Sequence, residues 1–356
     1  MTNPLTVKTT RRRLLLGGSA GAALGLAPSW TKIAFGAESE VVIGHWGGAG
    51  PKFMKRVLIP QLQQKLPGAR VFIKEGGGMD RMAQLKANPN NPAIDVLYVS
   101  AYDAKQMAQE GFTDPPDGEA VPEFNNLYPI AQDGAYGSYL HAITTIYDPA
   151  KVEAPTSWFD LWKPEYKGRV LVPNTKTIVN QMFVTATIRA MGGSETNPKD
   201  VQDARKKLLE LRQNVVVFHT GTSQALTVIK SGDAWLGVAV AGYVYQAKDK
   251  GQSVDVSYPK EGALAAVDAM TVAKHSQNKE VAHGFVNLAL SPSFQSGLAE
   301  ELYWGPTNSK ATVSDKTRAR IVFGEEDVKK LVMPQWDVIM PQRSEWIDWW
   351  DKNMAS

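Results

Sequence analysis

Histidine, serine and cysteine are the residues most often used for acid–base, metal or nucleophilic chemistry, and their pattern here predicts none of it. The five histidines, His45, His141, His219, His275 and His283, form no His-Glu-x-x-His pair and no other spacing typical of metal ligands. The single Gly-x-Ser-x-Gly match lies at 17–21, inside a segment that we expect to be removed. The absence of cysteine excludes disulfides, thiolate catalysis and iron–sulfur clusters. We therefore expect no catalytic residue, metal or cofactor, and an exported hydrolase is a distant alternative.

Binding chemistry is better represented, in short loops that combine glycine, hydroxyl and aromatic residues. Each loop follows a predicted strand, and ligands of open α/β sheets bind beyond the carboxyl ends of the strands. The loops are at 45–48, 76–78, 100–102, 173–175, 219–222 and 241–243. The glycines at 76–78 lack the Lys-Ser/Thr ending of a phosphate loop, so we expect a tight turn there. Together these loops suit a cleft that holds a small molecule.

The elements that must position these loops alternate between strand and helix. β-branched runs and segments of helical spacing follow one another, which is typical of a mainly parallel sheet covered by helices. We expect strands at 41–45, 70–74 and 94–99, and helices at 52–65, 79–86 and 102–110. After a loop at 114–126 the pattern restarts, with strands at 169–172, 215–218, 235–239 and 254–258 and helices at 177–191, 198–213, 223–231, 243–250, 279–290 and 292–300. Two α/β units in one chain predict two lobes with a cleft between them.

A terminal helix at 340–354 completes the pattern. It places Trp346, Trp349 and Trp350 at helical spacing. Such spacing favours packing in a core over stacking on a ligand.

The N-terminal segment has the composition of an export signal. Residues 1–36 carry five basic residues and no acidic one, and three of them, at 11–13, precede a short apolar stretch. This stretch is too short and glycine-rich to span a bilayer stably, so a membrane anchor is the less favoured alternative. The arginines also resemble a twin-arginine signal, while general secretory export stays open.

Removal of residues 1–36 changes the charge of the protein. The remaining chain has 34 basic and 36 acidic residues, so the net charge changes from +3 to −2. Such a chain has no overall positive potential that would attract nucleic acid.

Four motifs resemble the spermidine/putrescine-binding proteins of bacterial ABC importers. They are Ser-Trp-Phe-Asp-Leu-Trp-Lys-Pro-Glu-Tyr-Lys-Gly at 157–168, Pro-Lys-Glu-Gly at 259–262, the helix signature at 278–288, and Gly-Pro-Thr-Asn at 305–308. The resemblance covers residues 41–312. It implies a type II periplasmic-binding fold, with two α/β lobes joined by two crossover segments near 142–145 and 262–266. One lobe would contain 38–143 and 266–312, and the other 144–265 and 313–356.

Binding residues follow from the resemblance one position at a time. Trp46, Tyr102 and Trp304 match aromatic residues of the family's site. Asp268 matches a family acid and Thr220 a hydroxyl contact. In polyamine binders the aromatics enclose the methylene chain and carboxylates neutralise the ammonium groups.

Departures from the family pattern restrict the ligand. Thr175 and Ile178 stand where the family has acids, and Val240 and Ala266 where it has tryptophans. Each buried ammonium group needs an anionic partner. Asp268 as the single remaining acid therefore suits a ligand with one amine, such as an amino acid, a monoamine or a choline-like compound.

Polar groups remain for the other end of such a ligand. We expect Asn174, Thr175 and Thr220 to meet it. Gly47 and Gly48 permit close backbone approach, and their N–H groups leave a small carboxylate as an alternative ligand. The pattern predicts a monomeric periplasmic protein that captures a small solute for the membrane permease of an ABC importer, with no nucleic acid partner.

Overall fold

The computed structural model of the chain describes residues 39–175 and 177–354, so the predicted signal at 1–36 lies outside them. The strands are β1 (Ser39–His45), β2 (Ala69–Glu75), β3 (Val96–Ser100), β4 (Tyr136–Tyr147), β5 (Val170–Pro173), β6 (Val215–His219), β7 (Leu236–Val240), β8 (Asp255–Ser257), β9 (Leu264–Val272) and β10 (Gly305–Pro306). The α-helices are α1 (Ala49–Lys65), α2 (Gly78–Ala87), α3 (Ala101–Gln109), α4 (Ile178–Ala190), α5 (Pro198–Leu211), α6 (Thr222–Ser231), α7 (Ala241–Asp249), α8 (Lys279–Ala289), α9 (Pro292–Leu302), α10 (Asp315–Arg318), α11 (Glu325–Lys329), α12 (Trp336–Ile339) and α13 (Arg343–Asn353). The predicted alternation of strands and helices is confirmed, with shifts of a few residues at their ends.

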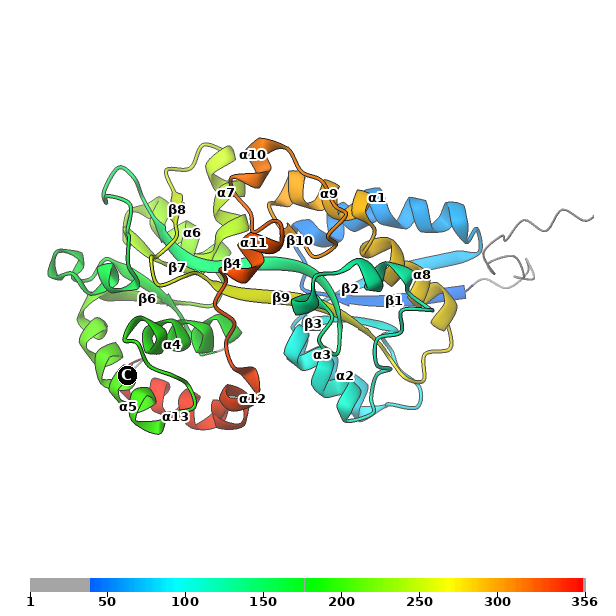
Figure 1. Ribbon diagram of the computed structural model, residues 1–356, viewed down its shortest axis with the longest axis horizontal. Coiled ribbons are helices and arrows are strands. Elements are labelled where there is room, and N and C mark those ends of the chain that lie inside the picture. Colours follow the sequence, from blue (N-terminus) through cyan, green and yellow to red (C-terminus); the bar gives the residue numbers. More distant parts are fainter. Residues whose placement is uncertain (1–38, 176, 355–356) are drawn as a thin grey trace, which may run out of the picture. The chain divides into compact units, whose positions relative to one another are not determined.

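One sheet joins two parallel halves through two antiparallel strands. Its order is β2-β1-β3-β9-β4-β7-β5-β6. β1 pairs in parallel with β2 and β3, while β5 pairs in parallel with β6 and β7. β9 and β4 pair with each other in the antiparallel direction. β9 also pairs with β3 of one parallel half, and β4 pairs with β7 of the other. Figure 1 shows these two long strands running from one half to the other, and they contain both predicted crossings.

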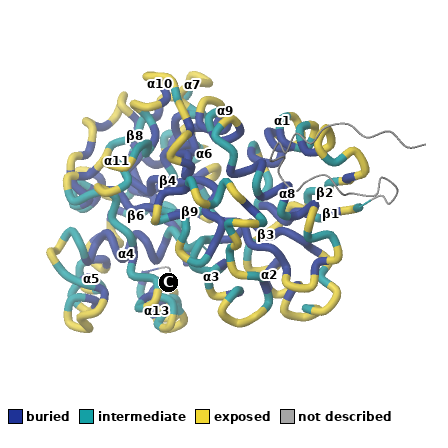
Figure 2. Tube along the Cα trace, turned by 45° about the vertical axis from the view of Figure 1, so that its right-hand side comes forward, coloured by how far each residue is buried: buried dark blue, intermediate teal, exposed yellow. Residues whose placement is uncertain are grey.

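Separate hydrophobic clusters lie on either side of the crossing. The first is built mainly from β1, β3, α1, α8 and α9, and the second from β5, α4, α5 and α13. Figure 2 shows buried residues following the strands, with exposed residues on loops and outer helix faces. Trp346 and Trp350 are buried in the second cluster and Trp349 packs at its edge, as the helical spacing predicts.

Two of the sequence motifs contact each other at the start of β9. The Ser157 hydroxyl donates to the Glu261 carboxylate (2.5 Å), and the Trp158 backbone N–H donates to its other oxygen (3.2 Å). The indole N–H of Trp158 donates to the Gly262 carbonyl (3.0 Å). The motifs at 157–168 and 259–262 therefore fix the point at which the second crossing strand begins.

The motif at 305–308 is held by one buried glutamine. The backbone N–H groups of Thr307 and Asn308 both donate to Gln295 Oε1 (2.8 Å each). Gln295 Nε2 donates to the Ser138 carbonyl on β4 (2.8 Å). This network attaches β10 and the beginning of α9 to the crossing strand, so the motif has a structural role.

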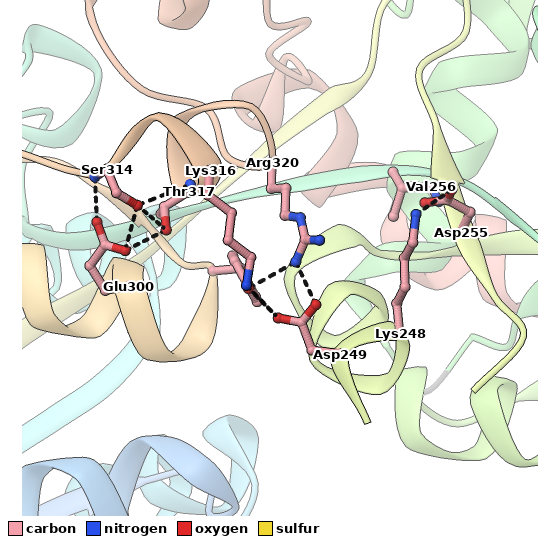
Figure 3. Close-up of polar contacts among 10 residues, drawn as sticks. Lys248, Asp249, Asp255, Val256, Glu300, Ser314, Lys316, Thr317 and Arg320 are labelled. Atoms are coloured by element: carbon pink, nitrogen blue, oxygen red, sulfur yellow. Dashed lines mark hydrogen bonds and ion pairs between the residues drawn. The ribbon is translucent and has the colours of Figure 1, made fainter. Parts of the chain in front are cut away.

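The segment around α10 is tied to two helices by polar contacts. Glu300 on α9 accepts hydrogen bonds from Ser314 Oγ (2.9 Å) and Thr317 Oγ1 (2.6 Å). Arg320 contacts Asp249 at the end of α7 (2.7 Å), and Figure 3 shows both groups of contacts. Hydrogen bonds from the Tyr303 hydroxyl and from Arg320 lower the pKa of Asp249 to about 2.

After α10 the chain passes from one hydrophobic cluster to the other. Val328 and Met333 pack against the first cluster, whereas Val332 and Trp336 pack against the second. Val332 accepts a backbone hydrogen bond from Ala265 and donates one to Ala263 (3.0 Å each), beside the start of β9. Residues of the stretch 328–336 therefore pack against both hydrophobic clusters.

Candidate functional site

A cavity of about 500 Å³ opens beside the two crossing strands. Its wall combines the start of α3, the middle of β9, the first turns of α4 and the segment before and within α12. The lining residues are Ser100, Ala101, Tyr102, Lys105, Ile130, Asp133, Ile178, Met182, Ala266, Val267, Asp268, Met333, Pro334, Gln335, Trp336, Asp337 and Val338. Segments far apart in sequence thus enclose a space of the size that holds a small organic molecule.

Asp268 occupies the centre of the sheet at this cavity. It lies on β9, directly opposite Ser100 of β3 and Tyr139 of β4. Its carboxylate remains 21% exposed and contacts His141 Nε2 at 3.1 Å. A carboxylate within an otherwise apolar strand requires partners. The imidazole supplies one of them, and the Asp268 side chain also lines the cavity.

Aromatic rings that do not line the cavity pack around His141. Tyr139 lies 4.5 Å from Trp304 and 5.2 Å from His141, measured between ring centroids. Tyr243 lies 6.2 Å from His141 and 5.9 Å from Trp304. Burial, and then the negative charge of Asp268, hold the pKa of Tyr139 well above its usual value. The rings therefore stay neutral and exclude water from one side of Asp268.

Arg81 is a buried cation in the same part of the protein as Asp268. Arg81 of α2 is 2% exposed, donates to the carbonyls of Gly76 and Tyr98, and stacks on Trp46 at 4.9 Å. Burial lowers its pKa to about 10, and Asp268 is among the groups that oppose this shift. Burial and the Arg81 charge together lower the pKa of His45 to about 3. At neutral pH, Arg81 is charged and His45 is not.

The outer wall of the cavity is aromatic and acidic. The rings of Tyr102 and Trp336 lie 6.4 Å apart at an angle of 46°. Burial and the nearby charge of Asp337 raise the pKa of Tyr102. Lys105, the one cation of the lining, contacts Asp133 at 3.0 Å. The lining therefore has three carboxylates against one ammonium group.

The structure brings some of the predicted binding residues together. Tyr102 and Asp268 line the same cavity. Trp46 is half-buried beside Arg81 and Tyr98. Trp304 is 1% exposed, packs against Tyr139 and His141, and does not line this cavity.

The remaining predicted residues lie away from this cavity. Thr175 is buried and donates from Oγ1 to Asp351 (3.0 Å), with Asn174 half-buried beside it. Thr220 is exposed, precedes α6 and bonds to Gln224 in the first turn of that helix. Gly47 and Gly48, both at φ 84°, form the turn into α1, and Gly48 lines a separate hollow with Tyr243.

Sequence analysis missed the C-terminal part of the wall. Trp336 and Asp337 follow Pro334 in a stretch without strand or helix periodicity, and the resemblance ends before them. His141 was also not predicted as a site residue. The sequence showed only that its spacing from the other histidines does not suit a metal site. The sequence did contain one usable signal. An aromatic and an acidic residue, Trp336 and Asp337, stand side by side in a part of the chain where no helix or strand was predicted.

No group of three or more His, Asp or Glu side chains within residues 39–175 and 177–354 is arranged to hold a metal ion. The same residues include no helix with the length and apolar composition needed to cross a bilayer.

Comparison with known proteins identifies the family. Residues 90–339 match the family of bacterial extracellular solute-binding proteins, and this match covers most of the chain. The chain belongs to this family. Several of the motifs that suggested this family belong to the framework of the solute-binding protein. They make the Ser157–Glu261 and Gln295–Thr307 hydrogen bonds described above.

Individual relatives agree with this assignment. The spermidine/putrescine-binding periplasmic protein of Escherichia coli K12 is 29% identical over 231 residues, which span 62% of this chain and 65% of that protein. The gamma-aminobutyric acid-binding protein of Pseudomonas aeruginosa PAO1 is 25% identical over 304 residues, or 83% and 82% of the two chains. A crystal structure of an ABC transporter substrate-binding protein from Bradyrhizobium japonicum USDA 110, 18% identical, superposes with a TM-score of 0.76 over 87% of this chain and 99% of that one. The predicted two-lobed periplasmic-binding fold is confirmed.

Proposed function

We propose that this solute-binding protein captures a small organic solute carrying an amine in the periplasm and delivers it to the permease of an ABC importer. The observation that supports the proposal best is the partly exposed Asp268 carboxylate, placed in a 500 Å³ cavity between aromatic and aliphatic walls. A carboxylate in such a site provides the counter-charge that a desolvated ammonium group needs. The protein would act as a monomer and catalyse no reaction.

The names of two relatives favour an amine. One is named for spermidine and putrescine, and the other for gamma-aminobutyric acid. All three compounds carry an ammonium group at neutral pH. Gamma-aminobutyric acid has one amine, and this number matches the single acid, Asp268, that the resemblance left at the family's positions.

A small carboxylate is the less favoured ligand. The cavity has Asp133, Asp268 and Asp337 on its wall, and its one ammonium group, that of Lys105, is already engaged by Asp133. The backbone of Gly47 and Gly48, which suggested an anion site, does not line this cavity. An anion would therefore meet net negative charge.

Ligand capture implies movement of two lobes about the crossing strands. We propose one lobe of 38–143 with 266–312 and another of 144–265 with 336–356, the stretch 313–335 being shared. The cavity takes residues from both, with Tyr102 on one side and Ile178 on the other. Closure of this kind encloses a ligand by a hinge motion.

The proposal is tested by a binding screen on the protein without its leader. Thermal unfolding and calorimetry would be measured with putrescine, spermidine, gamma-aminobutyrate, butylamine, choline, amino acids and small dicarboxylates. A ligand that binds the folded state at about 100 times its Kd stabilises that state by ~2.7 kcal/mol. Stabilisation by an amine supports the proposal, whereas stabilisation by dicarboxylates alone, or by none of the compounds, contradicts it.

Export predicts a shortened mature chain. We propose that residues 1–36 are a signal, of the twin-arginine type, and are removed. Intact-mass measurement of protein isolated from the periplasm should find a chain that begins near Ala37. A mature mass that includes Arg11, Arg12 and Arg13 would contradict this expectation. Replacing Arg11 and Arg12 by lysine should block export if the route is twin-arginine and leave it intact if the route is general secretion.

Trp336 is expected to contribute to affinity. Trp336→Ala removes the ring that neighbours Tyr102 in the cavity wall and should weaken binding of an amine about tenfold, the scale of one cation–π or aromatic contact. Calorimetry at neutral pH measures the change. Trp349→Ala, which removes the same side chain from a site beside Arg205, is the matched control and should bind as the wild type does. Equal affinities for wild type and Trp336→Ala would remove α12 from the site.

A further inference from the structure

The Lys105 side chain is held at a defined place in the cavity wall. It extends from α3, and its ammonium group contacts the Asp133 carboxylate at 3.0 Å. Its methylene stem packs against Gly134, where an added Cβ atom would lie 2.7 Å from Lys105 Cγ. Gly134 has φ 68°, which favours glycine, and its N–H donates to the Gln132 carbonyl (2.8 Å). The turn at 132–134 therefore leaves room for the lysine stem and places Asp133 at its end.

Two carboxylates share this part of the wall with the ammonium group of Lys105. Asp133 and Asp337 both line the cavity, and Asp337 is contributed by α12. The hydrogen bond with Asp133 and then, against the opposing effect of burial, the charges of Asp133 and Asp337 raise the pKa of Lys105. The ammonium group therefore stays charged at neutral pH and is attracted by both acids.

We propose that Lys105 determines the specificity of the cavity, because its ammonium group occupies a second cation subsite that Asp133 and Asp337 form. This inference rests on the proposed function, the capture of an amine. Asp268, on β9, lines the same cavity and is the carboxylate left for the ligand. The site then accepts a ligand with one ammonium group and disfavours a diamine, although the wall contains three acids.

Attachment to the chain favours the lysine over a second ammonium group of a ligand. A tethered group binds at a high effective concentration, on the order of mM for a short flexible tether. The Lys105 side chain is 27% exposed and that of Asp133 is 69% exposed, so the lysine takes the enclosed side of this pair. A second ligand ammonium would meet the exposed side, where ion pairs gain little because water screens them. It would also lie near a like charge, which opposes its binding.

The test compares monoamines with diamines of equal length. The probes are butylamine with putrescine and pentylamine with cadaverine, and calorimetry at neutral pH measures each Kd. Lys105→Met keeps the stem beside Gly134 but removes the ammonium group, which frees Asp133 and Asp337. We expect wild type to bind the monoamine of each pair more tightly. In Lys105→Met the affinity for the diamine relative to the monoamine should increase about tenfold or more, the scale of one added charge pair in a binding site.

Two further variants and a control accompany Lys105→Met. Lys105→Gln also removes the charge, should change the preference in the same direction, and decides the test if the methionine variant does not fold. Adding Asp133→Asn and Asp337→Asn to Lys105→Met removes the acids of the subsite and should cancel the gain. Lys248→Met is the matched control, since it breaks an ion pair with Asp255 (2.6 Å) outside the cavity (Figure 3) and changes the net charge equally. It should keep the wild-type preference.

The outcomes separate the role of Lys105 from the proposed function. An unchanged preference in folded Lys105→Met and Lys105→Gln would overturn the role of Lys105. A wild type that already binds the diamines about tenfold more tightly than the monoamines would overturn it as well. A gain that survives the removal of both acids would contradict the subsite, because the added ammonium group would then bind elsewhere. Failure of every probe to bind wild type and variants alike would overturn the proposed function itself.

Discussion

Asp268→Asn is expected to weaken binding of an amine ligand by about 30-fold or more, or ~2 kcal/mol at least, the scale for breaking a desolvated charge pair. The substitution keeps the shape of the side chain and a hydrogen-bonding oxygen for His141, which now lies 3.1 Å from the carboxylate. It removes the negative charge between the aromatic cluster and the cavity. Calorimetry with the tightest amine of the screen measures the loss.

A matched control separates charge at the site from charge of the protein. Asp348→Asn changes the net charge equally on an exposed position of α13 and should leave affinity unchanged. Thermal unfolding without ligand shows whether either variant is damaged. Equal affinity of Asp268→Asn and wild type would exclude Asp268 from the site, and with it an amine bound to this carboxylate.

Gln295→Met should have the largest effect on stability without touching the ligand cavity. Methionine is similar in size but leaves the buried backbone N–H groups of Thr307 and Asn308 without their acceptor, whereas the Ser138 carbonyl keeps the Thr307 hydroxyl as a donor. Each unsatisfied buried group costs about 1–3 kcal/mol, so the free energy of unfolding should decrease by at least ~2 kcal/mol. Urea denaturation with a constant slope measures this change.

Gln64→Met is the control for this variant. It makes the same exchange at an exposed position of α1 and is expected to stay within about 0.5 kcal/mol of wild type. Ligand affinity of folded Gln295→Met should equal that of wild type, because Gln295 does not line the cavity. A large loss of affinity with unchanged stability would show that the motif at 305–308 serves the ligand and not the framework.

The sequence predicted those parts of the fold that repeat a local pattern. Val41, Val96 and Val170 mark short apolar strands, and the helices between them show clear spacing, so the alternation was visible. Asn197, which caps α5 by accepting from the Lys199 N–H (3.0 Å), was recognisable from the Pro198 that follows it. Such features depend on neighbouring residues alone.

Features that depend on contacts with distant residues were harder to predict from the sequence. The twelve-residue strand β4 is buried along its whole length, so it shows no alternation of polar and apolar residues that would reveal its full extent. Trp304 was expected to face a ligand because its position matches an aromatic of the family. The structure instead packs it against Tyr139 and Tyr243 within the core, and no local pattern distinguishes these two environments.

In the candidate site, too, features that depend on neighbouring residues were predictable and features that depend on distant residues were not. Asp268 was identifiable because an acid in an apolar strand needs a partner, but the identity of that partner, His141, depends on the register of β4 against β9. Trp336 reaches the cavity because the chain returns to β9 after α11, and nothing in residues 313–335 predicts that return. The acid count of the cavity therefore increased from one to three once the fold placed Asp133 and Asp337 beside Asp268.

The backbone contact between Val332 and the start of β9 has a mechanical consequence. Two antiparallel strands alone form a narrow ribbon, which bends and also twists about its own length. A third segment bonded along the edge of that ribbon, as Val332 is to Ala263 and Ala265, widens it and resists torsion more than bending. If the two halves rotate against each other as proposed, we expect this contact to restrict the motion towards a single axis, so that each closure would return the facing walls of the cavity to the same register.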